Sequence, residues 1–237
     1  MRRIIITGGN GRFAKVLKKK LYGKKIYYLS KKQFNILNYK SLEKRIKILK
    51  PKTIIHLAAL SRPMSIHEKD ISNSINLNII GTANLASLCH AYKIKLIYFS
   101  TNYVYPGKKG NYKEEDSLLP NNNYAWSKLG GECSVHMLKN FLILRICMTE
   151  KPFIHKKAFS NIISSFAFHD FVAEIVPNIL NKKGVINIGG KRQSIYQFAK
   201  KQNYLVKKNI YKKDFLNIQK DSSININKLK KIINVKY

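Results

Sequence analysis

The chain has 237 residues, 45% hydrophobic and 11% aromatic, which predicts a globular protein of one domain or one domain plus a small lobe. No apolar run is long enough to span a membrane, and the first residues lead directly into a predicted strand, so we expect a cytoplasmic protein without a signal peptide. Cys89, Cys133 and Cys147 lack metal-ligand spacing. We expect reduced thiols there and no metal site.

The formal net charge of +33 raises the question of a nucleic-acid partner. The excess is nearly all lysine and the few arginines are scattered, whereas arginine is the residue expected at base and phosphate forks. No helix-turn-helix, zinc or RNA-binding motif is recognisable. The charge therefore predicts nonspecific adhesion to polyanions at low salt, and no specific nucleic-acid partner.

The first predicted element is a buried strand from Arg3 to Thr7, followed by the glycine-rich turn Thr-Gly-Gly-Asn-Gly-Arg-Phe-Ala. Apolar residues then recur at helical spacing. In the context of strand, turn and helix, Gly8 permits the tight turn and Gly11 lets backbone amides approach a pyrophosphate, while Ala14 allows close packing of helix on strand. The turn predicts dinucleotide binding, with an ordinary turn as the alternative.

The second predicted strand covers residues 25–29 and ends in a basic stretch. A site that prefers NAD usually places Asp or Glu near this end, to hold the ribose 2′-hydroxyl. Here Ser30, Lys31 and the nearby Arg12 suit a 2′-phosphate instead. The sequence favours NADP(H), with NAD(H) as the alternative, although a lysine-rich chain also produces basic strand ends by chance.

Further strands and helices alternate along the chain. The sequence predicts helices over 42–49 and 76–90, and strands over 53–60, 95–100 and 141–146. The small pair Ala58-Ala59 near the end of one strand leaves room for a flat ligand. Alternation of this kind predicts an α/β fold with a doubly wound parallel sheet.

Tyr124 and Lys128 lie four residues apart, so on a helix they share one face. An ammonium beside a phenol lowers a phenol pKa that is ordinarily about 10, which makes the tyrosine usable as an acid or base. Alone, the pair is more typical of a solvated helix face. Thr101, however, follows a predicted strand at the sheet edge where ligands bind in open α/β folds. Together with the glycine turn, the three residues favour catalysis.

Taken in order, several motifs resemble those of the extended short-chain dehydrogenases/reductases, which include nucleotide-sugar epimerases, dehydratases and reductases. They are the glycine turn, His-Leu-Ala-Ala at 56–59, Asn78, Ser-Thr-Asn-Tyr-Val-Tyr-Pro-Gly at 100–107 and Tyr-Ala-Trp-Ser-Lys at 124–128. Residues 168–172, 184–190 and 221–229 add similarity to the branch that resembles dTDP-4-dehydrorhamnose reductase. The resemblance extends from about residue 3 to residue 235.

The resemblance implies a Rossmann-type fold and a role for each matching residue. Catalysis would rest on Thr101, Tyr124 and Lys128. The cofactor would contact Thr7, Gly8, Gly11, Arg12, Phe13, Ser30, Lys31, Leu57, Ala58, Ala59, Asn78 and Ser100, together with Tyr124 and Lys128. The candidates for substrate contacts are Asn102, Arg145, Met148 and His155.

The resemblance also implies two parts: an NAD(P)-binding Rossmann domain, residues 1–147, and a reduced substrate-binding lobe, residues 148–237, interleaved with the last strand and helices of the core. Many relatives carry more sequence between Arg145 and Asp170 to enclose the sugar nucleotide. We therefore expect a pocket that is more open or that a partner subunit completes, as a homodimer or with a different subunit.

The implied activity is NAD(P)H-dependent reduction of a nucleotide-activated keto sugar, with tyrosine as the proton donor. Dehydration is disfavoured, because Asn102 and Tyr103 stand where dehydratases need an Asp-Glu pair. An epimerase that uses bound NAD is the alternative. A third interpretation is a noncatalytic NADP-binding subunit, a role that the regulatory subunit of methionine adenosyltransferase gives to this fold.

Overall fold

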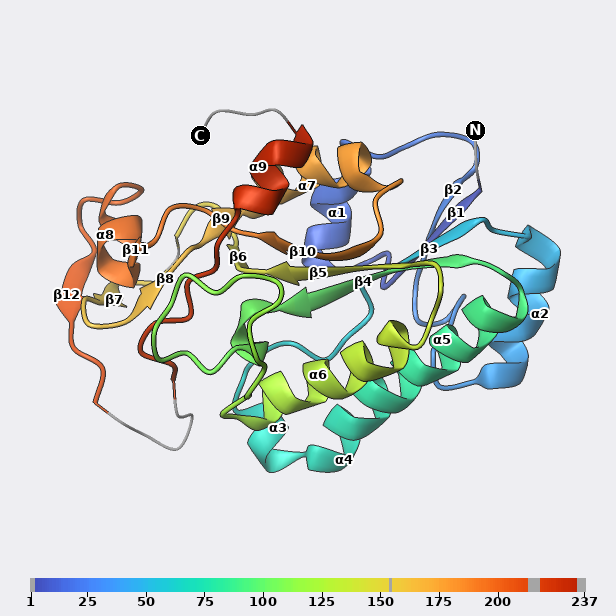
Figure 1. Cartoon of the computed structure of the whole chain (residues 1–237), viewed down its shortest axis with the longest axis horizontal. Helices are drawn as coiled ribbons and strands as arrows, with labels where there is room; N and C mark the ends of the chain where they lie inside the picture. Colours follow the sequence, from blue (N-terminus) through green and yellow to red (C-terminus); the bar gives the residue numbers. More distant parts are fainter. Residues whose placement is uncertain (1–2, 154, 213–217, 234–237) are drawn as a thin grey trace.

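A parallel sheet forms the centre of the computed structural model, which describes residues 3–153, 155–212 and 218–233. Its strand order is β10-β5-β4-β3-β1-β2, and each neighbouring pair is parallel (Figure 1). The strands are β1 Ile4–Thr7, β2 Ile26–Leu29, β3 Thr53–His56, β4 Lys95–Thr101, β5 Phe141–Ile146 and β10 Gly184–Ile188. The predicted α/β fold with a doubly wound parallel sheet is confirmed.

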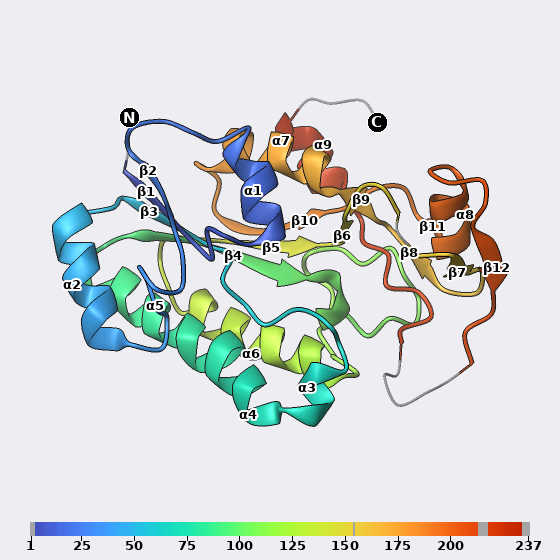
Figure 2. The same cartoon turned by 180° about the vertical axis from the view of Figure 1, so that it is seen from behind.

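Helices cover both faces of this sheet (Figures 1 and 2). One layer holds α1 (Arg12–Lys18), α7 (His169–Ile179) and α9 (Asn227–Ile233), and the other holds α2 (Tyr39–Leu49), α5 (Gly81–Ala91) and α6 (Asn123–His136). Successive strand side chains point to opposite faces. Ile4 and Ile6 therefore pack in the first layer's core while Ile5 packs in the second. Burial on both faces explains why the strands are almost wholly apolar.

The order of the strands reverses at β1, which pairs with β2 on one side and with β3 on the other. Chain segments that leave the carboxyl ends of β1 and β3 therefore diverge and border a crevice. In open α/β sheets this switch point is where ligands bind. The glycine turn follows β1 and the Leu-Ala-Ala segment follows β3, so the sheet topology places the two predicted cofactor segments side by side.

Two predicted elements differ most from the observed ones. β3 ends at His56, four residues before the predicted end, because residues 57–60 leave the sheet at the switch point. The predicted helix over 76–90 is a π-helix, η1 (Ile75–Ile80), that continues as α5. Short helices α3 (Ile66–Lys69) and α4 (Ile71–Ser74) precede it, and a 3₁₀ turn, η2 (Asn102–Val104), follows β4.

Short strands at one end of the sheet form a smaller lobe, seen at the opposite end from α2 in Figures 1 and 2. They pair as β6 (Met148–Thr149) with β9 (Ala167–Phe168), β7 (Lys157–Phe159) with β12 (Lys207–Asn209), and β8 (Ile163–Ser164) with β11 (Gln193–Ser194), and α8 (Ile195–Lys200) packs beside them. The same part of the chain also supplies β10, α7 and α9 to the main layers. A division at residue 147 stays a prediction.

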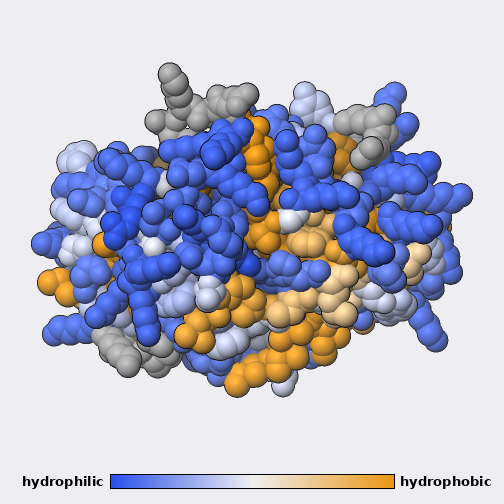
Figure 3. All heavy atoms as spheres, viewed as in Figure 1, coloured by the Kyte–Doolittle hydropathy of each residue, from blue (hydrophilic) through white to orange (hydrophobic). Residues whose placement is uncertain are grey.

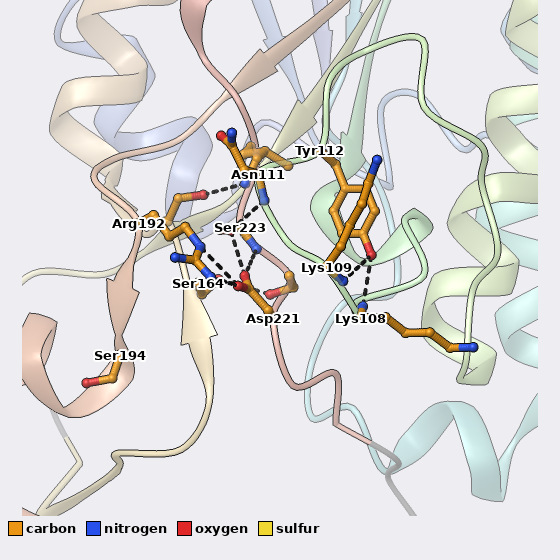
Figure 4. Close-up of polar contacts among 12 residues, drawn as sticks. Lys108, Lys109, Asn111, Tyr112, Ser164, Arg192, Ser194, Asp221 and Ser223 are labelled. Carbon is orange, nitrogen blue, oxygen red and sulfur yellow. Dashed lines mark hydrogen bonds and ion pairs between the residues drawn. The ribbon is translucent and has the colours of Figure 1, made fainter.

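Asp221 ties the C-terminal segment to this region (Figure 4). Its carboxylate accepts hydrogen bonds from the Arg192 guanidinium and, at 2.6 Å, from the Ser223 hydroxyl. The Ser223 hydroxyl in turn accepts the Asn111 backbone N–H, so residues 107–112 are held against residues 221–225.

Within the described residues, no helix is both long and apolar enough to cross a membrane.

Candidate active site

The glycine turn lies in direct contact with the segment after β3. Gly8 has φ +65°, and a Cβ atom there would come within 2.9 Å of the Ala58 backbone nitrogen. The Gly11 N–H donates to the Gly8 carbonyl at 2.8 Å, which closes the turn, and no side chain caps the start of α1. Only a chain without side chains fits between these backbones. The residues present therefore fit the pyrophosphate of a dinucleotide, as the sequence predicts.

Thr7 supports this turn from below through a directional chain of hydrogen bonds. Its hydroxyl accepts the Ala58 N–H at 3.0 Å. Because the Thr82 hydroxyl donates its proton to the Asn78 carbonyl, Nε2 of the neutral His56 ring carries the ring proton, and Nδ1 accepts from Thr7 at 2.9 Å. Nε2 of His56 then donates to the Thr82 hydroxyl at 3.1 Å, which donates to the Asn78 carbonyl. Burial lowers the pKa of His56 to about 3, so the ring is neutral and the chain keeps one direction. Thr7 is buried, and by accepting the Ala58 N–H it holds the segment after β3 in place beside the glycine turn.

Asn78 connects the crevice to the helix that carries the tyrosine. Its amide oxygen accepts the Leu60 N–H at 2.8 Å, and its amide nitrogen donates to the Leu60 carbonyl and to the Ser127 hydroxyl, both at 2.9 Å. One side chain thus satisfies backbone groups of a loop that has left the sheet. Leu57 and Ala58 are half-buried beside it, and Ala59 is exposed.

Ser30 and Lys31 lie at the carboxyl end of β2, beside the glycine turn, whose Gly9 N–H donates to the Leu29 carbonyl. The Ser30 hydroxyl and backbone N–H both donate to Oε1 of Gln33 at 3.0 Å, so this turn is locally ordered. Lys31 is exposed, as is Arg12 across the turn. In the described turn no carboxylate faces the site from this strand end.

The structure brings Thr101 and Tyr124 together at the end of β4. Thr101 is the last residue of β4, and its hydroxyl is within hydrogen-bonding reach of the Tyr124 phenol. Tyr124 sits in the first turn of α6, where Asn122 caps the helix by accepting the Ala125 N–H at 2.9 Å. Lys128 follows one turn later. Strand end and helix start together place a hydroxyl, a phenol and an ammonium at the edge of the sheet.

The electrostatics of the pair differ from the prediction. Burial raises the pKa of Tyr124, and the Thr101 hydroxyl and the charge of Arg62 oppose that rise. Burial also lowers the pKa of Lys128 to about 7, against the attraction of Glu132. The Lys128 Nζ lies 4.2 Å from the centre of the Tyr98 ring. Desolvation is thus the largest cause of both pKa shifts. Tyr124 is held protonated, as a proton donor must be.

Two predicted contact residues serve the interior instead. The Arg145 guanidinium is 3% exposed, donates from Nε to Glu132 at 3.0 Å, and also donates to the Tyr105 hydroxyl and the Glu114 carbonyl. The Ser100 hydroxyl donates to the other oxygen of Glu132 at 2.7 Å. Because these groups are satisfied inside the fold, the predicted substrate contact of Arg145 is wrong, and Ser100 faces Glu132 rather than the crevice.

The remaining substrate candidates lie in different settings. Asn102 is buried, and its amide donates to the Ser222 carbonyl at 2.8 Å, which links the segment after Thr101 to the C-terminal segment. Met148 is half-buried in β6. His155 is exposed and packs edge-on against the Phe153 ring at 5.4 Å. The Asn102 amide is used inside the fold and the His155 ring packs on Phe153. The role of both residues in substrate binding stays a prediction.

Comparison with known proteins decides the family. Residues 1–169 match the family model of the RmlD substrate binding domain. The chain belongs to this family. It is 26% identical to the dTDP-4-dehydrorhamnose reductase of Bacillus anthracis, solved in complex with NADP, with a TM-score of 0.88 over 97% of this chain and 92% of that one. It is also 31% identical, over 136 residues, to the dTDP-4-dehydrorhamnose reductase of Aggregatibacter actinomycetemcomitans.

A second group of relatives of this RmlD-family chain has a different name. Methionine adenosyltransferase 2 subunit beta of Pongo abelii is 31% identical over 157 residues, which cover 61% of this chain and 46% of that protein. The reductase of Aggregatibacter actinomycetemcomitans is also covered over 46% of its length. The chain thus spans about half the length of the curated relatives it matches.

Sequence reasoning missed other residues of the RmlD-family site. The His67 ring lies 5.0 Å from that of Tyr124, and its Nδ1 is 2.5 Å from the Ser74 hydroxyl. Glu68 accepts the Asn123 N–H at 3.1 Å and so fixes the start of α6. Both belong to α3, in the segment after β3. The rule that ligands gather at carboxyl ends of strands pointed to that segment, but not to these side chains.

Proposed function

We propose that the chain is an NAD(P)H-dependent reductase of a nucleotide-activated keto sugar. The observation that carries the proposal is the convergence of Thr101, Tyr124 and Lys128 at the carboxyl edge of the sheet, beside a glycine turn that fits a pyrophosphate. Membership of the RmlD family and the likeness to a dTDP-4-dehydrorhamnose reductase support it. The expected class is therefore an oxidoreductase.

The chain's residues divide the chemistry between them. When bound, the nicotinamide cofactor supplies the hydride. Tyr124, whose pKa is raised by burial, keeps its proton at neutral pH and passes it to the oxygen of the carbonyl that is reduced. Thr101 stabilises the charge that develops on that oxygen with a preorganised hydroxyl. Lys128, buried beside the tyrosine, would hold the ribose next to the nicotinamide.

The preferred cofactor in this proposal is NADP(H). The end of β2 offers Ser30 and the exposed Lys31, and the exposed Arg12 lies across the turn. Such groups suit a 2′-phosphate better than the two hydroxyls of an NAD ribose. The structure of the Bacillus anthracis reductase contains NADP, which supports this preference. NAD(H) is the alternative, since another structural neighbour, an enzyme of Bordetella bronchiseptica, was solved with NAD.

One observation favours a second candidate, a noncatalytic NADP-binding regulatory subunit. A relative named methionine adenosyltransferase 2 subunit beta matches 61% of the chain at 31% identity. The described triad argues for catalysis, because a regulatory role needs no hydroxyl, phenol and ammonium in one place. An epimerase that uses the same triad with bound NAD would invert its product without consuming cofactor.

Turnover with purified protein tests the proposal. NADPH and a dTDP- or UDP-linked 4-keto-6-deoxy sugar should give a steady loss of NADPH absorbance. Tyr124→Phe should lower kcat by about 10²- to 10⁴-fold, the usual contribution of a positioned proton donor. Tyr22→Phe changes an exposed tyrosine outside the described site. It is the control and should retain full activity. Wild-type rates in Tyr124→Phe would contradict the assignment of Tyr124 as the proton donor. Binding of cofactor without turnover of any keto sugar would contradict the reductase and favour the regulatory candidate.

A further inference from the structure

Three charged side chains from three separate segments meet at the rim of the crevice. Oε1 of Glu150 lies 2.9 Å from Nε of Arg12, and Oε2 lies 3.8 Å from Nη1 of Arg62. Arg12 begins α1 after the glycine turn, Arg62 lies in the segment after β3, and Glu150 follows β6. One carboxylate thus serves as counter-ion for an arginine from each side of the switch point.

The arrangement is unusual for this chain, and its ion pairs are weak enough for a ligand to displace Glu150. Only 12 Asp and Glu accompany 45 Lys and Arg, yet two arginines share Glu150. The three side chains are 58%, 44% and 24% exposed for Arg12, Arg62 and Glu150, respectively. Ion pairs with this exposure contribute little to stability. A phosphate, with more charge and more acceptor oxygens than a carboxylate, would compete well for the same two guanidinium groups.

Arg62 also lies close to the catalytic groups. Its charge opposes the burial that raises the pKa of Tyr124 and of Tyr103. At His169, burial lowers the pKa first, and the charges of Arg62 and Arg12 lower it further, while Glu150 acts in the opposite sense. Arg12 thus lies at the glycine turn, and Arg62, which shares Glu150 with it, lies within electrostatic range of Tyr124.

We propose that Arg12 and Arg62 together clamp a phosphate of the bound ligand, and that Glu150 occupies the clamp as an internal counter-ion until that phosphate displaces it. The inference rests on the proposed function, because it assumes a ligand of that class. The phosphate has two sources: the dinucleotide cofactor and the nucleoside diphosphate of the sugar substrate. In both cases Arg62 contributes to affinity and Glu150 reduces it.

Glu150→Gln is the sharpest test, since it keeps the side chain's shape and removes the competing charge. We expect the dissociation constant of at least one ligand to fall by about three- to tenfold, where tenfold corresponds to about 1.4 kcal/mol. Arg62→Gln should raise the same constant by about tenfold or more, and Arg62→Lys should restore only part of the loss, because lysine lacks the planar fork. Glu174→Gln is the matched control: Glu174 pairs with Lys20 at the surface.

Binding is measured without turnover, by NADPH fluorescence in one arm and by calorimetry with dTDP and UDP in the other. A change confined to NADPH assigns the clamp to the cofactor, and a change confined to dTDP or UDP assigns it to the substrate. Unchanged constants for both ligands in Glu150→Gln and Arg62→Gln, with normal thermal unfolding, would overturn the inference alone. Wild-type protein that binds neither ligand would overturn the proposed function and the clamp with it.

Discussion

At the scale of single residues, Arg145 and Glu132 form a charged pair inside the protein. The Arg145 side chain is 3% exposed and that of Glu132 is fully buried, and Ser100, Tyr105 and the Glu114 carbonyl satisfy their remaining hydrogen bonds. A pair of this kind is costly to assemble but more costly to break, because the remaining partner is a buried charge without a counter-ion. Its role is structural, because it joins β5 to α6, the helix that carries Tyr124.

We predict that Arg145→Met lowers the free energy of unfolding by about 3–5 kcal/mol. The measurement is urea unfolding at neutral pH, monitored by circular dichroism. Lys20→Met removes a cation from the exposed pair with Glu174 and should cost less than about 1 kcal/mol. Equal losses in the two variants would contradict the buried-pair interpretation, as would an Arg145→Met protein that unfolds like the wild type.

Lys128 should make stability depend on pH. Its pKa in the folded protein is lowered by burial to about 7 from 10.5, so between these values the unfolded chain binds the extra proton and the folded chain does not. Stability then rises with pH across this window, at up to about 1.4 kcal/mol per pH unit. The cost of the buried charge is fully present below about pH 7.

The difference in unfolding free energy between wild type and Lys128→Met, measured from pH 6 to pH 10, should therefore move in favour of the wild type as pH rises. Lys40→Met, on the exposed side of α2, is the control for the general effect of losing a lysine. A difference that does not change with pH, or that moves in the opposite direction, would show that Lys128 keeps its charge in the folded protein.

Residue type and spacing were enough to predict that Thr101 ends a strand and that Tyr124 and Lys128 share the following helix, while their catalytic roles stay a prediction. They were not enough for Arg145 and Ser100. Each is the second-to-last residue of its strand, near the sheet edge where ligands bind, but a single buried carboxylate on α6, Glu132, accepts hydrogen bonds from both. Such a contact depends on how helix and sheet pack, which local sequence does not report.

At the scale of elements, the contact between α6 and the π-helix holds the tyrosine. Gly131 of α6 faces the π-helix: a Cβ there would lie 2.5 Å from the Asn78 carbonyl oxygen and 2.6 Å from the Tyr98 hydroxyl. The adjacent Gly130 faces only the end of the Ile79 side chain, at 2.8 Å. Backbone cannot move aside as a side-chain end can, so the two glycines should respond differently to the same change.

Gly131→Ala should lower the free energy of unfolding by about 1–3 kcal/mol, the usual cost of overpacking, and should lower activity because α6 carries Tyr124. Gly130→Ala should be within about 1 kcal/mol of the wild type, since a helical alanine is favoured over glycine by a similar amount. Thermal unfolding and turnover of the two variants make the comparison. Equal destabilisation would mean that close approach of α6 to the π-helix is not what Gly131 provides.

Elements with strong local signals were predicted well. β5 has the predicted bounds, and β1 and β2 each begin one residue later than predicted. The π-helix was not predicted, because an apolar pattern over 76–90 is also that of an α-helix. Its wider turn is set by tertiary contacts: Asn78 reaches the Leu60 backbone and Ser127 at the same time. Helix propensity alone does not predict such a contact.

At the scale of the whole molecule, alternation of strands and helices was sufficient to predict a doubly wound parallel sheet, because connection rules leave few arrangements for alternating strands and helices. The small lobe was less predictable: its strands are two or three residues long and pair across distant parts of the chain, as β7 does with β12. The net charge of +33 also has no local consequence for the fold. It acts on association, where copies of the chain repel one another.

An apolar face on the helical layer predicts where a second copy would bind despite this repulsion. Trp126 and Met137 lie on one side of α6, three turns apart, and are 48% and 85% exposed. Ile71, Ile75 and Ile80 extend the face over α4 and the π-helix, and hydrophobic side chains gather along this lower edge in Figure 3. Residues four, seven and eleven positions after Trp126 are Gly130, Cys133 and Met137, so the stripe on α6 carries no charge.

We predict a homodimer through this face, measured by light scattering during size-exclusion chromatography. Trp126→Glu should give monomers, because burying a carboxylate in an apolar contact costs several kcal/mol. Leu205→Glu, at an exposed apolar position on the small lobe, should leave the dimer intact. Since the copies repel, added salt should strengthen the dimer by screening. A wild type that is monomeric at high concentration and high salt would contradict the prediction, and a Trp126→Glu dimer would place the contact on another face.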